Sequence, residues 1–356
     1  MNAPPRISSI QPQSVAVRPI RVMLVDDSHV ARSIFARLLS EHEALQVVAE
    51  AADSKEALAY LQKNTVDVVL LDIEMPQRSG LEALPDIVAA SRGARIIVVS
   101  SFVEENGPAA VKALSLGACD TLAKPGRSGF GTGFSDRLIE KVKRLGRRGR
   151  SCDAAHLHQL APFEISKPEC LAIGASTGGI PVIHKLLQGL DENFDCPIFI
   201  VQHLPVAFMD FFAKQLSSFT KRPVTVAASG TIVKQGHIYV APGNAHLVCR
   251  RVHNKVVLDH VAEFSDSRYC PSVDALFSSV ADVYADKAMA IILSGMGNDG
   301  VAGARELSSQ KAIILAQDLE SSVVWGMPGA VVREKLASAV LSPEELSAFL
   351  TEAARQ

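Results

Sequence analysis

The chain has 356 residues, 48% of them hydrophobic, and a formal net charge of −2 at pH 7. This length predicts two or three domains that can each bury a core. The near-neutral charge gives no reason to expect a nucleic acid or an anionic membrane as partner. The six cysteines form no C-x-x-C pair and no apolar run is long enough to span a bilayer. We therefore expect reduced thiols in a cytoplasmic protein.

The first domain is expected to be a parallel α/β unit. Residues 1–19 are rich in Pro, Ser and Gln and are predicted to form a disordered extension, because they offer little to bury. After them, continuous apolar strands alternate with helical segments, which is typical of a parallel sheet covered on both faces. The predicted strands are Ile20–Val25, Leu45–Ala49, Val66–Leu71, Arg95–Val99 and Ala118–Ala123, with helices at Ser54–Lys63 and Asp136–Leu145.

Polar side chains follow the carboxyl ends of four of these strands, namely Asp26, Asp27, Asp72, Ser100 and Lys124. In a parallel sheet these ends share one edge, where ligand sites form. Carboxylates gathered at one place repel one another unless a cation neutralises them, and oxygen ligands suit Mg²⁺. A lysine and a hydroxyl there can hold phosphoryl oxygens, and Asp72 can act as a nucleophile that forms an acyl phosphate. The alternative is that each acid only caps a helix.

Four motifs lie at these strand ends: V-D-D-S at 25–28, L-D-I-E-M-P at 71–76, V-V-S-S at 98–101 and A-K-P at 123–125. With them, this half resembles response-regulator receiver domains. The resemblance implies a flavodoxin-like fold, a histidine kinase as phosphodonor and Asp72 as the phospho-acceptor. It implies that Asp26, Asp27 and Asp72 hold Mg²⁺ with the Glu74 carbonyl, that Ser100 is the switch hydroxyl, and that Lys124 binds the phosphate. Arg78 and Ser79 depart from the family pattern, which leaves the phosphate lifetime and the choice of donor open.

Residues 147–167 are predicted to be an exposed linker, so that the first domain covers 20–146 and the second covers 168–356. The basic run Lys141–Arg150 offers a nucleic-acid or membrane site, but a solvated helix end is favoured because cations suit a helix C-terminus. His156 and His158 lack further ligands at zinc spacing, so no metal site is predicted in the linker.

The second domain opens with an apolar strand and a glycine-rich turn, I-G-A-S-T-G-G at 173–179. Residues 174–178 fit G-x-S-x-G, the spacing of a nucleophile elbow. The glycines permit a sharp turn that leaves the Ser176 hydroxyl clear at the strand end. Backbone N–H groups at the following helix start can then face an oxyanion. On this stretch alone, a phosphate-binding turn is an equal alternative.

The alternation of strands and helices continues to the C-terminus, interrupted by a segment expected to be a β-hairpin insertion. Ser176, His203 and Asp299 each follow a parallel strand, which is the placement of a nucleophile, a general base and its orienting acid. Their chain order differs from that of α/β-hydrolases. A phosphate-binding loop is an alternative interpretation of residues 295–300, but this segment lacks the lysine of a P-loop. The strands are Pro197–Val201, Met289–Leu293 and Ala312–Leu315; the insertion is Val224–Ala227, Ile238–Ala241, His246–Arg251 and Lys255–Leu258; the helices are Pro181–Leu190, Ala207–Ser218, Ser272–Tyr284, Ala302–Ser309 and one capped by Ser342.

Further motifs in this half are Q-H-L-P at 202–205, A-P-G-N at 241–244, P-S-V-D at 271–274 and L-S-G-M-G-N-D-G at 293–300. Together with the Ser176 turn they resemble the catalytic domain of chemotaxis protein-glutamate methylesterases. The resemblance implies a Rossmann-like serine esterase under phosphorylation control that hydrolyses glutamate γ-methyl esters on chemoreceptors, with possible deamidation of receptor glutamine. It implies the Met296 N–H as an oxyanion donor, Thr177 as a site neighbour, no cofactor for the esterase step, and membrane contact only through receptors.

Two other classes of protein were weighed. A nucleotide-binding regulator is disfavoured because no ribose-binding acid stands at the expected distance in a G-x-G-x-x-G context. A DNA-binding response regulator is disfavoured because the second domain shows no helix-turn-helix or basic face.

Overall fold

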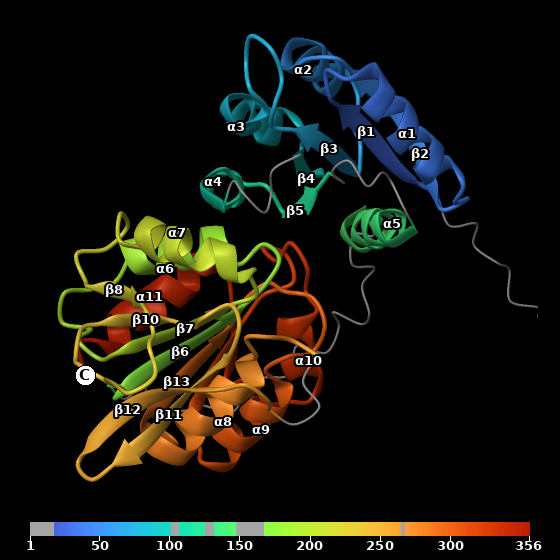
Figure 1. The fold of residues 1–356 in the computed structure, drawn as a ribbon. Coiled ribbons are helices and arrows are strands. Elements are labelled where there is room, and N and C mark those ends of the chain that lie inside the picture. The colour runs from blue at the N-terminus through green and yellow to red at the C-terminus, as the bar shows by residue number, and fades with distance from the viewer. Residues whose placement is uncertain (1–17, 101–106, 125–131, 147–166, 265–267) are drawn as a thin grey trace, which may run out of the picture.

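The protein consists of two α/β domains stacked end to end (Figure 1). The structure, a computed structural model, describes residues 18–100, 107–124, 132–146, 167–264 and 268–356. Most of the predicted extension (1–19) and linker (147–167), including His156 and His158, lie outside the described residues. The described cysteines are free thiols, and no helix in the described part of the chain is long and apolar enough to cross a bilayer.

The N-terminal domain holds a five-stranded parallel sheet in the order β2-β1-β3-β4-β5. This is the flavodoxin-like order, in which ligands bind beyond the carboxyl ends of the strands. Apolar side chains from the two faces of the sheet enter different core clusters beneath the covering helices. The elements are β1 (Ile20–Val25), α1 (His29–Ser40), β2 (Leu45–Ala51), α2 (Ser54–Lys63), β3 (Val68–Asp72), α3 (Gly80–Ala90), β4 (Arg95–Ser100), α4 (Gly107–Ser115), β5 (Asp120–Ala123) and α5 (Thr132–Gly146).

The C-terminal domain holds a seven-stranded parallel sheet in the order β15-β14-β13-β6-β7-β10-β8. The buried central strands β6, β7 and β13 bring their carboxyl ends to one edge. The strands of this sheet and the α-helices of the domain are β6 (Cys170–Ala175), α6 (Ile180–Gln188), β7 (Ile198–Gln202), α7 (Val206–Leu216), β8 (Val224–Val226), β10 (Ile238–Val240), α8 (Val273–Tyr284), β13 (Ala288–Ile292), α9 (Val301–Ser309), β14 (Ile313–Gln317), α10 (Met327–Arg333), β15 (Ala339–Leu341) and α11 (Pro343–Ala353).

The hairpin insertion is smaller than the sequence suggests. β11 (His246–Val252) and β12 (Lys255–Val261) pair antiparallel, and β9 (Thr231–Ile232) joins them in a separate small sheet. The two other segments assigned to the insertion, β8 and β10, instead extend the main parallel sheet beside β7. Short apolar runs of this kind fit either sheet by periodicity alone, so only the tertiary pairing separates them.

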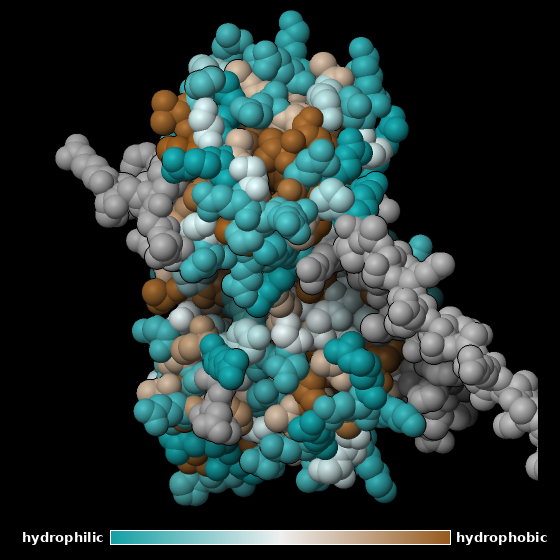
Figure 2. Space-filling view, turned by 90° about the vertical axis from the view of Figure 1, so that its right-hand side faces the viewer, coloured by the Kyte–Doolittle hydropathy of each residue, from teal (hydrophilic) through white to brown (hydrophobic). Residues whose placement is uncertain are grey.

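Polar residues cover much of the side of the molecule that Figure 2 presents, with apolar residues in small groups between them. A buried histidine, His184, lies in the middle of α6. His184 is 5% exposed and stacks on Phe219 with ring centroids 4.1 Å apart. Its Nε2 has no hydrogen-bond partner within the described ranges. Burial, and then the charge of Lys112, lowers the pKa of His184 to about 4.

His184 should make the protein less stable in mild acid. Below pH 6.5 the unfolded chain protonates this histidine, while the folded chain resists protonation until about pH 4. Stability is therefore lost as the pH falls through this window, by roughly 3 kcal/mol in full. We expect the unfolding free energy of His184→Leu to depend less steeply on pH in urea titrations at about pH 7 and about pH 5. His253→Asn, at an exposed turn, is the control; an equal slope in both variants would contradict the assignment.

Candidate catalytic and phosphorylation sites

The Ser176 turn is held by the strands on both sides of β6. The Ser176 N–H donates to the Ser294 carbonyl at 3.1 Å, and the Gln202 Nε2 donates to the Ser176 carbonyl at 2.9 Å. Gly178 has φ of +82°, and a Cβ on Gly295 would lie 2.8 Å from the Ser176 Cβ. The backbone at both positions therefore requires glycine, which has no side chain. The result is a fixed turn with its serine at the carboxyl edge of the sheet.

His203 and Asp299 form a close pair at the same edge. His203 directly follows β7, and Asp299 lies in the loop between β13 and α9. The His203 Nε2 and the Asp299 Oδ2 are 2.7 Å apart. Burial raises the pKa of Asp299, but its hydrogen bond and ion pair with His203 outweigh this and keep that pKa below the usual range. Asp299 is therefore an ionised carboxylate that orients the imidazole.

Further residues surround this pair whose contacts with it the sequence did not indicate. The Asp299 Oδ1 accepts from the Ser272 Oγ at 2.8 Å, and the backbone N–H of Val273 donates to the Oδ2 at 2.8 Å. Tyr269 stacks on the His203 ring, with centroids 4.8 Å apart and planes 5° from parallel. The P-S-V-D motif marked Ser272, but nothing in its composition indicated contact with a residue 27 positions away.

Two backbone donors lie beside Ser176. Met296 directly follows Gly295, which packs on Ser176, and Thr177 is the next residue in the serine turn. Over the described ranges, neither the Met296 N–H nor the Thr177 N–H donates to a protein acceptor. Backbone donors in such a place suit an oxyanion that develops near the serine hydroxyl.

The N-terminal domain covers this edge. Helix α4 packs against α6 and α7, and the Arg95 Nη2 donates to the Ser322 carbonyl at 3.2 Å across the boundary. A cavity of about 40 Å³ remains, lined by Leu114 and Cys119 from the first domain and by Ser176 and His203 from the second. Such a cavity holds on the order of three waters, whereas ligand sites commonly measure about 300–1,000 Å³. In this arrangement the N-terminal domain leaves little enclosed space at Ser176.

Ser176 and His203 line one cavity but are not yet engaged. In the part of the chain that the structure describes, no hydrogen bond joins the Ser176 hydroxyl to the imidazole. Catalytic hydrogen bonds are often loose before substrate binds. The structure thus brings the three predicted residues to one edge, where Ser176 and His203 line one cavity without a hydrogen bond between them.

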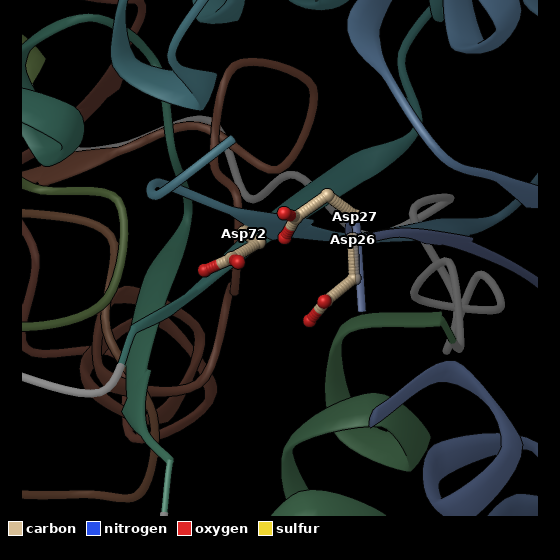
Figure 3. A group of neighbouring side chains, drawn as sticks. All are labelled: Asp26, Asp27 and Asp72. Atoms are coloured by element: carbon tan, nitrogen blue, oxygen red, sulfur yellow. The ribbon is translucent and has the colours of Figure 1, made fainter. Parts of the chain in front are cut away.

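The second site lies at the carboxyl edge of the first sheet (Figure 3). One carboxylate oxygen from each of Asp26, Asp27 and Asp72 lies within 4.8 Å of the others. The Lys124 Nζ contacts the Asp26 Oδ2 at 2.7 Å and the Asp72 Oδ2 at 2.8 Å. Ser100 is buried at the end of β4, and its carbonyl accepts from the Lys124 N–H at 2.7 Å. All five predicted residues therefore meet at one place.

The electrostatics of this cluster fit a divalent cation. Burial raises the pKa of Asp72 to about 6, with Lys124 acting in the opposite direction. Burial lowers the pKa of Lys124, but its contacts with Asp26 and Asp72 outweigh this and raise it. The buried Asp72 Oδ1 has no hydrogen-bond partner among the described residues. Carboxylate oxygens with an unsatisfied acceptor are the donor set that Mg²⁺ takes.

Arg78, which departs from the family pattern in the loop after Asp72, contacts α3. Its Nη2 donates to the Asp86 Oδ2 at 2.6 Å and to the Glu82 carbonyl at 2.9 Å. The guanidinium is thus engaged with α3. A Cβ on Gly80 would lie 1.9 Å from the Asp72 carbonyl oxygen. Only glycine therefore allows α3 to start this close to the end of β3.

Comparison with known proteins gives two matching family models: residues 171–350 match the CheB methylesterase model and residues 22–129 match the response regulator receiver domain model. A protein-glutamate methylesterase/protein-glutamine glutaminase 2 of Caulobacter vibrioides is 39% identical over 346 residues, which cover 94% of this chain and 99% of that protein. One of Rhodospirillum rubrum is 35% identical, covering 95% and 96%. The crystal structure of the Thermotoga maritima CheB methylesterase catalytic domain aligns with a TM-score of 0.50 at 34% identity, covering 53% of this chain and 99% of that one.

Proposed function

Because the chain belongs to the CheB family of protein-glutamate methylesterase/protein-glutamine glutaminases with a receiver domain, we propose that it hydrolyses glutamate γ-methyl esters on chemoreceptors. The reaction releases methanol and leaves glutamate. The observation that carries the proposal is the convergence of Ser176, His203 and Asp299 at one sheet edge beneath a phosphorylatable domain. Deamidation of receptor glutamine belongs to the same proposal, since it proceeds through the same acyl-enzyme.

Ser176 is the nucleophile in this proposal. The His203 Nε2 is bonded to Asp299, which leaves the Nδ1 to accept the serine proton. The Ser176 Oγ attacks the ester carbonyl, and the oxyanion is stabilised by the N–H groups of Met296 and Thr177. His203 then returns the proton to the departing methoxide. Water, deprotonated by the same imidazole, releases the glutamate carboxylate and frees Ser176. No cofactor is assigned to these steps.

The receiver domain supplies the control. Asp26, Asp27 and Asp72, with the Glu74 carbonyl, would hold Mg²⁺, which neutralises their charge and that of a phosphoryl group. The Asp72 carboxylate takes the phosphoryl group as an acyl phosphate from a histidine kinase. Lys124 contacts Asp72, and Ser100 is the last residue of β4, the strand beside β3; both would contact the phosphoryl oxygens. A new dianionic group at this edge favours a different arrangement of β4, β5 and α4.

The position of α4 links phosphorylation of the first domain to access at Ser176 in the second. Helix α4 and the start of β5 close the cavity over Ser176, so any rearrangement there changes access to the serine. Phosphorylation is proposed to shift the equilibrium between the covered arrangement and an open one.

The receiver domain is assigned to residues 20–146, the linker to 147–167 and the catalytic domain to 168–356. The protein is placed in the cytoplasm, where it meets the membrane only through its receptors.

The test is methanol release from methylated receptor membranes, with and without a small phosphodonor and Mg²⁺. Release that rises with phosphodonor supports both halves of the proposal. Release that ignores the phosphodonor would leave the esterase and contradict the control. No release from folded protein, together with stabilisation by a nucleotide, would favour the nucleotide-binding alternative.

Opening the domain boundary by mutation should imitate phosphorylation. Leu114 is 8% exposed and faces the cavity beside Leu204, so Leu114→Asp places a charge in an apolar contact. We expect methanol release without phosphodonor to rise about tenfold, a shift of about 1.4 kcal/mol in the open–covered equilibrium. Lys55→Glu, at an exposed position of α2, is the control and should leave release unchanged. Unchanged release from a Leu114→Asp protein that still accepts phosphate would count against the covering role of α4.

A further inference from the structure

We infer that Ser272 is a positioning residue of the catalytic site, which fixes the Asp299 carboxylate for His203; this rests on the proposed function of Asp299. The Ser272 Oγ donates to the Asp299 Oδ1 at 2.8 Å. Both residues are buried, Ser272 at 0% and Asp299 at 2% exposure. A hydrogen bond from a hydroxyl to a buried carboxylate is among the stronger ones in proteins.

The Asp299 carboxylate is held on each of its oxygens. The Oδ1 accepts from the Ser272 Oγ and from the Asp274 N–H at 3.1 Å, while the Oδ2 accepts from the Val273 N–H and from His203. An ionised carboxylate offers about four acceptor sites, so these donors fill it. Rotation of the group would break several bonds at once, which fixes the direction of the oxygen that meets His203.

Ser272 stands at the N-cap of α8 but does not cap its own helix. An N-cap serine ordinarily accepts from a backbone N–H of the first turn, and the Ser272 side chain makes no such bond. The Asp299 carboxylate takes that place by accepting from the N–H groups of Val273 and Asp274. The Ser272 hydroxyl is thereby turned from acceptor to donor and points at the catalytic acid.

A histidine in turn fixes the backbone of Ser272. The Ser272 N–H donates to the His246 Nδ1 at 3.1 Å, and His246 is itself 4% exposed on β11. The hairpin sheet, α8 and the loop before α9 therefore meet at Ser272. Because the backbone is anchored separately, loss of the hydroxyl should loosen the carboxylate without releasing the helix start.

The test compares Ser272→Ala with a matched control on the same helix. Ser278 is also buried on α8, at 8% exposure, and its hydroxyl has no partner among the described residues, so Ser278→Ala removes an equal group that orients nothing. With phosphodonor and Mg²⁺ present, we expect Ser272→Ala to lower kcat for methanol release about tenfold with KM within about twofold. Ser278→Ala should match the parent. Ser272→Cys, which keeps volume but donates weakly, should resemble Ser272→Ala and serves where the alanine variant folds poorly.

A second background separates positioning from a general packing effect. If Ser272 acts through Asp299, then Ser272→Ala added to Asp299→Asn should change kcat by less than about twofold, because residues that act as a unit are not additive. An equal loss in both backgrounds, or a parent-like kcat for Ser272→Ala and Ser272→Cys, would overturn the inference. Full activity of Asp299→Asn alone would overturn the proposed triad itself, which is a different result from failure at Ser272.

Discussion

Replacing Ser176 with alanine is expected to lower methanol release at least about 10⁴-fold, whether or not phosphodonor is present. The reason is that the Ser176 hydroxyl stands at a strand-end turn, lines one cavity with the His203 imidazole and has backbone donors beside it. The measurement is initial-rate methanol release from methylated receptor membranes, with KM determined where any rate remains.

The Ser176→Ala protein carries its own control for folding. Its receiver domain is untouched, so it should accept phosphate from a small phosphodonor at the parent rate. Retained phosphorylation with lost methanol release places the defect in the chemistry of the second domain. Near-normal methanol release from this variant would remove Ser176 from the mechanism.

Replacing Asp72 with asparagine is expected to abolish activation by phosphodonor, so that rates with and without it become equal. The amide cannot form an acyl phosphate, and it removes one of the carboxylates that face Lys124. Basal release should stay near that of the unphosphorylated parent, since Ser176 and its partners are unchanged. The measurement is the ratio of initial rates with and without phosphodonor at fixed Mg²⁺.

The matched control removes a carboxylate elsewhere in the same domain. Asp86, an exposed residue of α3, is paired with Arg78, and Asp86→Asn should keep full activation. Activation that survives Asp72→Asn would show that control reaches the esterase by another route. Loss of activation in both variants would instead indicate a general defect of the receiver fold.

The sequence predicted the parallel sheets well because their strands are continuous apolar runs that end in marked polar residues. Asp72 and His203 were found in this way, since strand ends in a parallel sheet must share an edge. The strands around residues 224–241 were misassigned, because short runs fit a hairpin as well as an edge of the main sheet. Only pairing with β7 decides between them.

Contacts between distant segments could not be predicted from the sequence. Ser272 carries an ordinary N-cap signal, and nothing local shows that its hydroxyl serves Asp299 instead. Tyr269 gives no sign that its ring will cover His203. The seating of α4 over Ser176 depends on complementary surfaces of two domains, which periodicity within either domain does not describe.

The Asp299 carboxylate serves both the proposed reaction and the stability of the fold, two demands that often conflict in enzymes. A buried catalytic charge commonly weakens the fold that carries it. Here the same charge satisfies the Val273 and Asp274 N–H groups at the start of α8, which would otherwise lack acceptors in the core. Selection for a well-folded second domain therefore also preserves the carboxylate that is proposed to orient His203. A lineage that lost the reaction would have to find a new helix cap before it could shed this residue.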